Sequence, residues 1–245
     1  MGESMLATLT RLSSAQKGRA RGAPAYSVYV NRPVGRLLAA IAYRIGLSPN
    51  QVTIVSAVFT FAGIAVIALV PPQPWVGMVV WLLLALGYAW DSADGQVARL
   101  RGGGSLAGEW LDHFVDALKI SSLHLAVLVG LSRVEEIPRS WLLVPIAFAI
   151  VANTTFFAMI LNDLLKGKRG VASAQSAGGA SPIRSLLLLP TDYGILVLAF
   201  VTWGWSVLFL GIYTLLLIAC TLFLAAAAVT WFRQMQRLDR ETVAS

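Results

Sequence analysis

The sequence predicts an all-α, polytopic membrane protein in which an amphipathic surface helix precedes six transmembrane helices. Of the 245 residues, 57% are hydrophobic and 13% are charged, whereas soluble domains carry about 25% charged residues. Two early apolar stretches, 51–70 and 75–90, approach the length of about 20 residues that a helix needs to cross a bilayer. The net charge of +7 comes from basic residues spread around such stretches. We therefore expect contacts with membrane lipids and no nucleic-acid partner.

Two segments precede the first predicted span. Residues 1–27 are basic and rich in Ser, Gly and Ala, which predicts a flexible tail. Residues 28–47 carry arginines between apolar residues at near-helical spacing, and these apolar residues are Leu37, Leu38, Ile41, Ile45 and Leu47. This pattern predicts an amphipathic helix that lies on the membrane surface.

Residues 48–235 form the predicted membrane domain. Its spans run over about 51–70, 75–100, 106–131, 140–165, 185–201 and 206–232. The junction of the last two carries Trp203 and Trp205, a pattern typical of the membrane interface. Residues 236–245 are predicted to form a C-terminal tail.

The lysines and arginines predict the orientation. Nearly all of those outside the spans fall on the side of the two termini, and the other side carries only Arg133 and Arg139. Cytoplasmic loops are enriched in basic residues. We therefore expect an integral protein of a bacterial inner membrane, with both termini on the cytoplasmic side.

Four aspartates lie within 26 residues at the predicted cytoplasmic ends of the second and third spans: Asp91, Asp94, Asp112 and Asp116. Their spacings of three and four residues place each pair on one helix face. Carboxylates at membrane depth are costly and mark functional sites. Hard cations such as Mg²⁺ or Mn²⁺ suit an all-carboxylate site. The pattern predicts two divalent ions, an arrangement typical of phosphoryl-type displacement.

The residues between and around the aspartates resemble a known signature. The spacing Asp-x2-Asp-Gly-x2-Ala-Arg-x8-Gly-x3-Asp-x3-Asp runs from Asp91 to Asp116 with every fixed position filled. It resembles the signature of the CDP-alcohol phosphatidyltransferase family. Pro49-Asn50-x-x-Thr53 is similar to the motif that opens the first span in that family. The signature covers about a tenth of the chain, and the layout of spans extends the likeness to nearly all of it.

This resemblance implies metal-dependent transfer of a substituted phosphoryl group from a CDP-linked donor, such as CDP-diacylglycerol, to an alcohol, with release of CMP in phospholipid biosynthesis. One of the two substrates is expected to be a lipid. The resemblance further implies that Asp91, Asp94 and Asp112 bind metal, and that Asp116 lies near the second metal and is the general base. It implies a homodimer and a pocket for the CDP moiety lined by Asn50, Thr53, Gly95, Ala98, Arg99 and Gly108.

The residues after the fourth aspartate bear on the acceptor. Subfamilies that use phosphorylated polyols carry Lys or Arg directly after it, whereas this chain has Ala117. The run Asp112-His-x-x-Asp116-Ala-Leu is more similar to the choline and ethanolamine phosphotransferases. Transfer from a small CDP-alcohol to a lipid acceptor is therefore an alternative. Lys119, one turn beyond Asp116, and Arg184 are the candidates for acceptor binding.

A divalent-cation transporter is the alternative from another class, because membrane-embedded acids also line ion pathways. Transport sites lie near the middle of the bilayer, commonly in broken helices. The predicted position of the aspartates at one end of two spans favours the enzyme.

Overall fold

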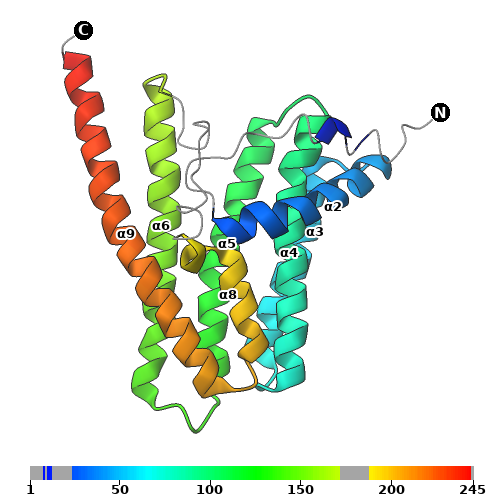
Figure 1. The fold of residues 1–245 in the computed structure, drawn as a ribbon, viewed down its shortest axis with the longest axis vertical. Helices are drawn as coiled ribbons and strands as arrows, with labels where there is room; N and C mark the ends of the chain where they lie inside the picture. The colour runs from blue at the N-terminus through cyan, green and yellow to red at the C-terminus, as the bar shows by residue number, and fades with distance from the viewer. Residues whose placement is uncertain (1–7, 9, 13–23, 172–187, 244–245) are drawn as a thin grey trace.

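A bundle of long helices, crossed on one side by a shorter helix, forms the framework of the protein (Figure 1). The computed structural model describes residues 8, 10–12, 24–171 and 188–243, and this part of the chain contains no strand. In chain order the elements are η1 Ser27–Asn31, α2 Arg32–Arg44, α3 Pro49–Leu69, α4 Pro74–Leu100, α5 Leu106–Leu131, η2 Arg139–Leu142, α6 Leu143–Lys168, η4 Leu189–Thr191, α8 Tyr193–Ala199, η5 Phe200–Thr202 and α9 Ser206–Val243.

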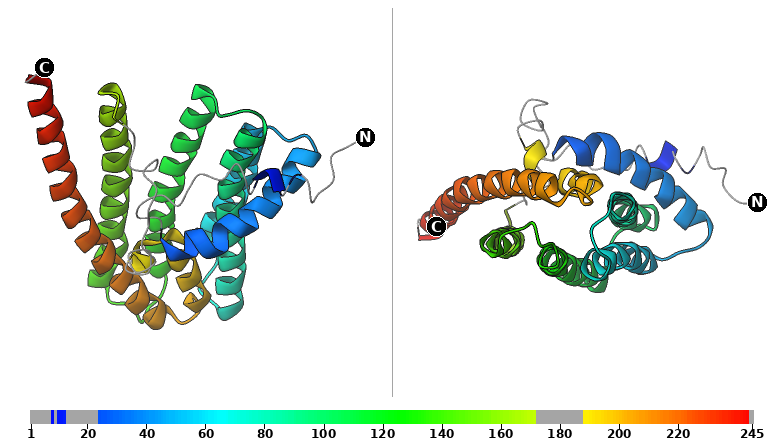
Figure 2. Two further views of the ribbon diagram at one scale, coloured as in Figure 1. Left: turned by 45° about the horizontal axis from the view of Figure 1, so that its top comes forward. Right: turned by 90° about the horizontal axis from the view of Figure 1, so that it is seen from below.

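Within the described residues, five helical segments are long and apolar enough to cross a membrane: α3, α4, α5, the joined η2 and α6, and α9. The predicted all-α, polytopic fold is confirmed, and the protein is an integral membrane protein. Helix α3 packs closely against both α4 and α5, whereas α9 leans away from them towards its C-terminal end (Figures 1 and 2).

The fifth predicted span, 185–201, differs from the structure. Residues 185–187 lie outside the described part, and the apolar helix that follows covers only Tyr193–Thr202, which is too short for a span. Pro190 lies in the short turn η4, and the Asp192 carboxylate then caps α8 by accepting a hydrogen bond from the Gly194 backbone N at 3.0 Å. A proline and a capping residue begin a new helix here, which the apolar composition alone did not indicate.

The two tryptophans before α9 have different environments. Trp205 is exposed, as expected at an interface, but Trp203 is fully buried. A Cβ atom at Gly130 of α5 would lie 2.6 Å from the Trp203 ring, so the glycine makes room for this ring. The Trp203 ring also packs edge-on against Phe209, with centroids 4.8 Å apart. The prediction that both tryptophans are interfacial is therefore wrong for Trp203, which belongs to the core.

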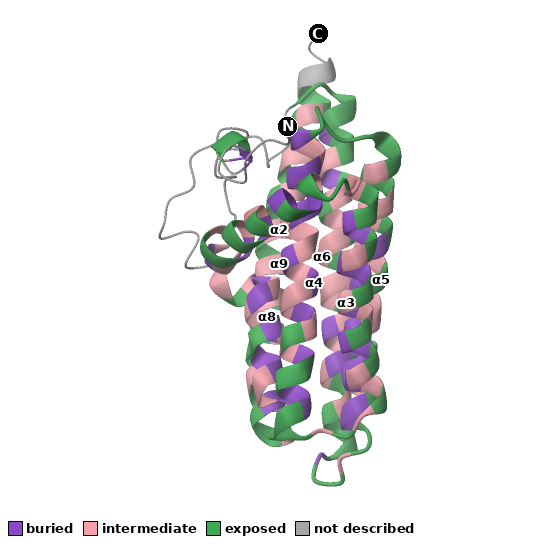
Figure 3. Cartoon of the chain, turned by 90° about the vertical axis from the view of Figure 1, so that its right-hand side faces the viewer, coloured by how far each residue is buried: buried purple, intermediate pink, exposed green. Residues whose placement is uncertain are grey.

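The buried residues follow the inward faces of the long helices (Figure 3). The larger core cluster joins α3, α4, α5, α6, α8 and α9, and its largest buried side chains are Trp203, Tyr213, Phe200 and Phe209. It includes one polar contact, in which His124 Nδ1 lies 2.5 Å from the Tyr213 hydroxyl. His124 is therefore a packing residue with a satisfied partner, far along α5 from the aspartates.

Helix α2 lies against α4 through its small residues. Ala39, Ala40 and Ala42 are fully buried, whereas Leu37 and Ile41 are exposed. Leu37 and Ile41 thus point away from the protein, as contact with a membrane surface requires. The boundary of this surface helix differs slightly from the prediction, because η1 and α2 together run over 27–44.

Both predicted tails are partly helical. Within 1–27, the described residues 10–12 form a helical turn, and Leu12 is buried against the alanines of α2 and against α4. At the other end, α9 continues to Val243, so most of the predicted tail 236–245 extends the last helix. Burial of Leu12 stabilises the helical turn in the N-terminal segment. Helix propensity accounts for the extension of α9 into the C-terminal tail.

Candidate active site

The four aspartates come together because α4 and α5 run antiparallel on either side of one short turn and both pack against α3. Asp91 lies nine residues before the end of α4, and Asp116 lies ten residues after the start of α5. With a rise of about 1.5 Å per residue, both are about 15 Å from the turn and reach the same level. Gly102 and Gly103 allow this turn through positive φ angles of 96° and 130°.

Three of the aspartates form one cluster. Asp91, Asp112 and Asp116 each present a carboxylate oxygen, and these oxygens all lie within 4.8 Å of one another. The residues are partly buried. Carboxylates at such distances repel one another unless cations compensate them. The cluster therefore has the donor atoms and the spacing that a hard divalent cation requires.

Asp94 makes a different set of contacts. Its side chain is buried, with 9% of the residue exposed. Thr53 Oγ1 of α3 donates a hydrogen bond to Asp94 Oδ2 at 2.8 Å, and the Gly95 backbone N donates to Asp94 Oδ1 at 2.5 Å. Asp94 is thus adjacent to the cluster but is oriented by α3, which the sequence alone did not show.

Helix α3 is held in place by its N-terminus. The Ser48 hydroxyl accepts a hydrogen bond from the Gln51 backbone N at 3.3 Å, and Gln51 Oε1 accepts one from the Ser48 backbone N at 2.8 Å. This reciprocal cap satisfies two backbone donors at the start of the helix. Thr53, in the first turns of the same helix, donates to Asp94 of α4.

Lys119 lies inside the carboxylate cluster. Its Nζ donates to Asp91 Oδ1 at 2.5 Å, to Asp116 Oδ1 at 3.2 Å and to Ser56 Oγ at 3.1 Å. The residue is only 8% exposed. The structure therefore places this candidate for acceptor binding directly on two of the predicted metal ligands.

Ser56 was not among the predicted site residues. Its hydroxyl donates to the Gly87 carbonyl at 2.9 Å and lies 3.4 Å from Asp91 Oδ1, besides its contact with Lys119. The sequence holds a signal for it: Thr53, Ser56 and Thr60 recur at helical spacing on one face of an otherwise apolar span, and all three are buried.

The predicted CDP pocket residues lie around the same helix ends. A Cβ atom at Gly108 of α5 would be 3.1 Å from Asn50 Oδ1 of α3, so the glycine allows these helix starts to approach. A Cβ atom at Gly95 would be 3.6 Å from Arg99 Nη1, which places this guanidinium beside the glycine. Ala98 is on the last turn of α4 and is partly buried.

The structure describes only one of two other basic residues, Arg184 and Arg101. Arg184 lies outside the described residues. Arg101 donates from Nη2 to the Leu47 carbonyl at 2.9 Å and lies over the Tyr43 ring at 5.5 Å. It therefore fastens the α4–α5 turn to the end of α2.

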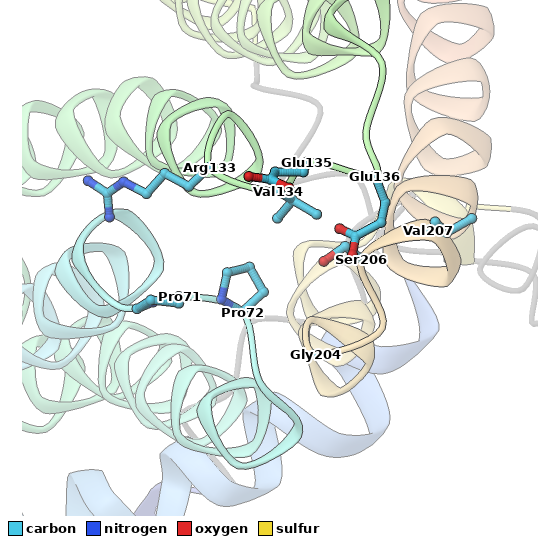
Figure 4. Close-up of a pocket in the computed structure, with 9 residues that line it drawn as sticks. All are labelled: Pro71, Pro72, Arg133, Val134, Glu135, Glu136, Gly204, Ser206 and Val207. Atoms are coloured by element: carbon cyan, nitrogen blue, oxygen red, sulfur yellow. The ribbon is translucent and has the colours of Figure 1, made fainter.

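A separate pocket lies at the opposite ends of α4 and α5 (Figure 4). It is lined by Pro71, Pro72, Arg133, Val134, Glu135, Glu136, Gly204, Ser206 and Val207. None of the predicted site residues lines it, and its two glutamates are exposed. We therefore place the active site at the aspartates.

Comparison with known proteins identifies the family. The sequence profile described as CDP-alcohol phosphatidyltransferase matches residues 46–232, which is more than half of the chain. The chain belongs to the CDP-alcohol phosphatidyltransferase family. The match contains α3, α4 and α5 and hence every aspartate of the site. The resemblance seen in the signature is thereby confirmed.

One similar relative in this family is a phosphatidylinositol phosphate synthase of Corynebacterium glutamicum. It is 36% identical over 110 residues, which cover 44% of this chain and 46% of the relative. The chain thus matches about half of the length of that relative.

Two crystal structures of Mycobacterium tuberculosis phosphatidylinositol phosphate synthase share the fold. The apo form has a TM-score of 0.52 and 21% identity, and the comparison covers 80% of this chain and 94% of that protein. The complex with manganese and citrate has a TM-score of 0.51 and 21% identity, covering 83% and 89%. At this identity the likeness is one of fold.

Proposed function

We propose that this member of the CDP-alcohol phosphatidyltransferase family transfers a phosphatidyl group from CDP-diacylglycerol to an alcohol hydroxyl and releases CMP, in phospholipid biosynthesis. The observation that carries the proposal is the cluster of three carboxylates on two membrane helices, with oxygens within 4.8 Å of one another. The family and the synthase activity of the Corynebacterium relative support a phospholipid product.

The residues of the cluster fit divalent metal. All the donors are carboxylate oxygens, the ligands that Mg²⁺ and Mn²⁺ prefer. The Mycobacterium protein of the same fold was solved with manganese, which supports Mn²⁺ as a probe. We propose that Asp91, Asp112 and Asp116, with Asp94 beside them, hold two ions. When bound, such ions neutralise the carboxylates and stabilise negative charge on the phosphate oxygens.

The chain's own residues supply the rest of the chemistry. In the proposed reaction the acceptor oxygen forms a bond to the phosphorus of the phosphatidyl group, the bond from phosphorus to the CMP oxygen breaks, and Asp116 takes the hydroxyl proton. Thr53 fixes the orientation of the Asp94 carboxylate through its hydrogen bond. Arg99 provides a planar set of donors suited to phosphate oxygens.

The pocket for the CDP moiety is proposed at Asn50, Thr53, Gly95, Ala98, Arg99 and Gly108, at the ends of α3, α4 and α5. Asn50 lies next to Gly108, and Arg99 lies next to Gly95, so the polar side chains proposed to bind the CDP moiety stand beside glycines that carry no side chain. Lys119 and Arg184 stay candidates for the acceptor. An ammonium near Asp116 favours an anionic acceptor, and the names of the relatives favour an inositol phosphate.

Setting and assembly are part of the same proposal. We place the protein in a bacterial inner membrane with the termini and the aspartates on the cytoplasmic side, as a homodimer whose membrane domain is 48–235. The aspartates lie within about 15 Å of the helix ends. The match to a family of transferases favours an enzyme over a cation transporter.

The purified protein should be incubated with Mn²⁺, a donor and an acceptor while released CMP is measured. The donors are CDP-diacylglycerol and a small CDP-alcohol, and the acceptors are inositol phosphate, glycerol phosphate, inositol and diacylglycerol. We expect CMP only with CDP-diacylglycerol and a water-soluble alcohol, and none from Asp112→Asn. Release only from the small CDP-alcohol would support the alternative donor. No release from any pair, with Mn²⁺ uptake into proteoliposomes, would support the transporter instead.

A further inference from the structure

Lys119 is a cation that the chain places among its own metal ligands. Its ammonium has three N–H donors, and three acceptors surround it: Asp91 at 2.5 Å, Asp116 at 3.2 Å and Ser56 at 3.1 Å. All three hydrogens therefore have a partner within the protein. Because Lys119 is only 8% exposed, water contributes little to its solvation.

The ammonium and a divalent ion need the same atoms. Asp91 and Asp116 are two of the three residues whose oxygens converge within 4.8 Å, and both are ion-paired to Lys119. A cation at Lys119 neutralises part of the repulsion between these carboxylates. It also repels any second cation that approaches them, and this repulsion is strong where the local dielectric is low.

We propose that Lys119 is an internal counter-ion that holds the carboxylates of Asp91 and Asp116 while the site is free of metal and competes with divalent ions for them. This inference rests on the proposed function of the aspartates as a metal site. Its consequence is weak metal binding by the protein alone, because a divalent ion has to displace the ammonium. The displaced Lys119, one turn from Asp116, then has donors available for an anionic substrate.

The competition predicts an effect opposite to that of an ordinary structural ion pair. If Lys119 only braced the ligands, its removal would disorganise them and weaken metal binding. If Lys119 competes with metal, an uncharged side chain of similar length should strengthen metal binding. Lys119→Met is the informative change, and Lys166→Met is the matched control, because Lys166 is equally buried at 8% but lies on α6 and makes no ion pair with a described residue.

The test is a Mn²⁺ titration of the full chain in detergent micelles, with free Mn²⁺ measured by electron paramagnetic resonance and no substrate present. We expect Lys119→Met to bind Mn²⁺ at least about tenfold more tightly than the unaltered protein, which corresponds to about 1.4 kcal/mol. Lys166→Met should bind like the unaltered protein. Equal or weaker binding by Lys119→Met would overturn the proposal.

A second measurement serves if Lys119→Met folds poorly. In EDTA the uncompensated carboxylates should lower its melting temperature. Mn²⁺ should raise that temperature by more than it does for the unaltered protein, because tighter binding at the same Mn²⁺ concentration stabilises the folded state more. A smaller rise would contradict the proposal. If Mn²⁺ bound to neither protein, the metal site itself would be refuted. If both bound equally while CMP was released, only the role of Lys119 would fail.

Discussion

The hydrogen bond from Thr53 to Asp94 offers a sharp test of how α3 contributes to the site. Thr53→Val keeps the shape of the side chain and removes the hydroxyl, which donates to Asp94 Oδ2 at 2.8 Å. Asp94 is buried, so water cannot readily replace this donor. The Gly95 backbone N would then remain as a donor to this carboxylate.

The size of the effect expected from Thr53→Val follows from the charge on Asp94. A hydrogen bond to a charged group contributes about 1.5–3 kcal/mol, and each 1.4 kcal/mol is about a factor of ten. Partners that orient metal ligands typically change metal affinity or activity by about 10–100-fold when removed. We therefore expect Thr53→Val to raise the Mn²⁺ concentration needed for half-maximal CMP release by about 10–100-fold.

The assay is CMP release from CDP-diacylglycerol as a function of Mn²⁺ concentration. The matched control is Thr155→Val on α6, because among the described residues the Thr155 hydroxyl bonds only to the Val151 carbonyl of its own helix, at 2.7 Å. This control should leave the Mn²⁺ dependence unchanged. A Mn²⁺ dependence within twofold of the unaltered protein for Thr53→Val would refute the idea that α3 orients a ligand.

Three further tests, one of them with a control variant, concern the site and the packing that supports it. Asp116→Asn should lower kcat by at least about 100-fold, since an amide cannot take the proton, yet bind Mn²⁺ in part; full turnover would exclude Asp116 as the base. Gly87→Ala should lower the melting temperature, because its Cβ would meet α3. Gly211→Ala is the control, because a Cβ atom there meets no other atom of the described residues, and it should raise the melting temperature slightly. Equal changes in the melting temperature of the two variants would contradict close α3–α4 packing. Asp192→Ala should lower the free energy of unfolding by about 0.5–2 kcal/mol. It should also speed hydrogen exchange at the Ser27 amide, which donates to Asp192 at 2.8 Å. An unchanged exchange rate would show that this contact does not hold η1.

Much of the site was predictable because its signals are local in sequence. Asp91 and Asp116 stand at nearly equal distances from the turn between α4 and α5, so an antiparallel pair of helices has to bring them to one level. Other contacts are not local. Ser56 and Lys119 are 63 residues apart, and Thr53 and Asp94 are 41 apart. Their pairing depends on how α3 rotates against α4 and α5, and helical spacing within one span carries no information on that rotation.

The membrane segments also divide into those that local sequence predicts and one that depends on contacts between distant residues. Apolar length predicted α3, α4, α5 and α6 closely, because each has to span a bilayer of fixed thickness. It failed at 185–201, where Asp192 begins a short helix by accepting hydrogen bonds from both Gly194 and Ser27. A capping carboxylate that also bonds a segment 165 residues away is a tertiary feature.

By itself, the sequence determined the membrane fold class, the family and the four aspartates, because composition, helix length and short-range spacing are properties of the linear chain. The tertiary structure decided which groups meet across helices. It separated Asp94, held by Thr53, from the three clustered carboxylates, and it placed Lys119 between two of them. Helix packing decides these contacts, since the rotation and depth of each helix depend on side chains far away in the sequence.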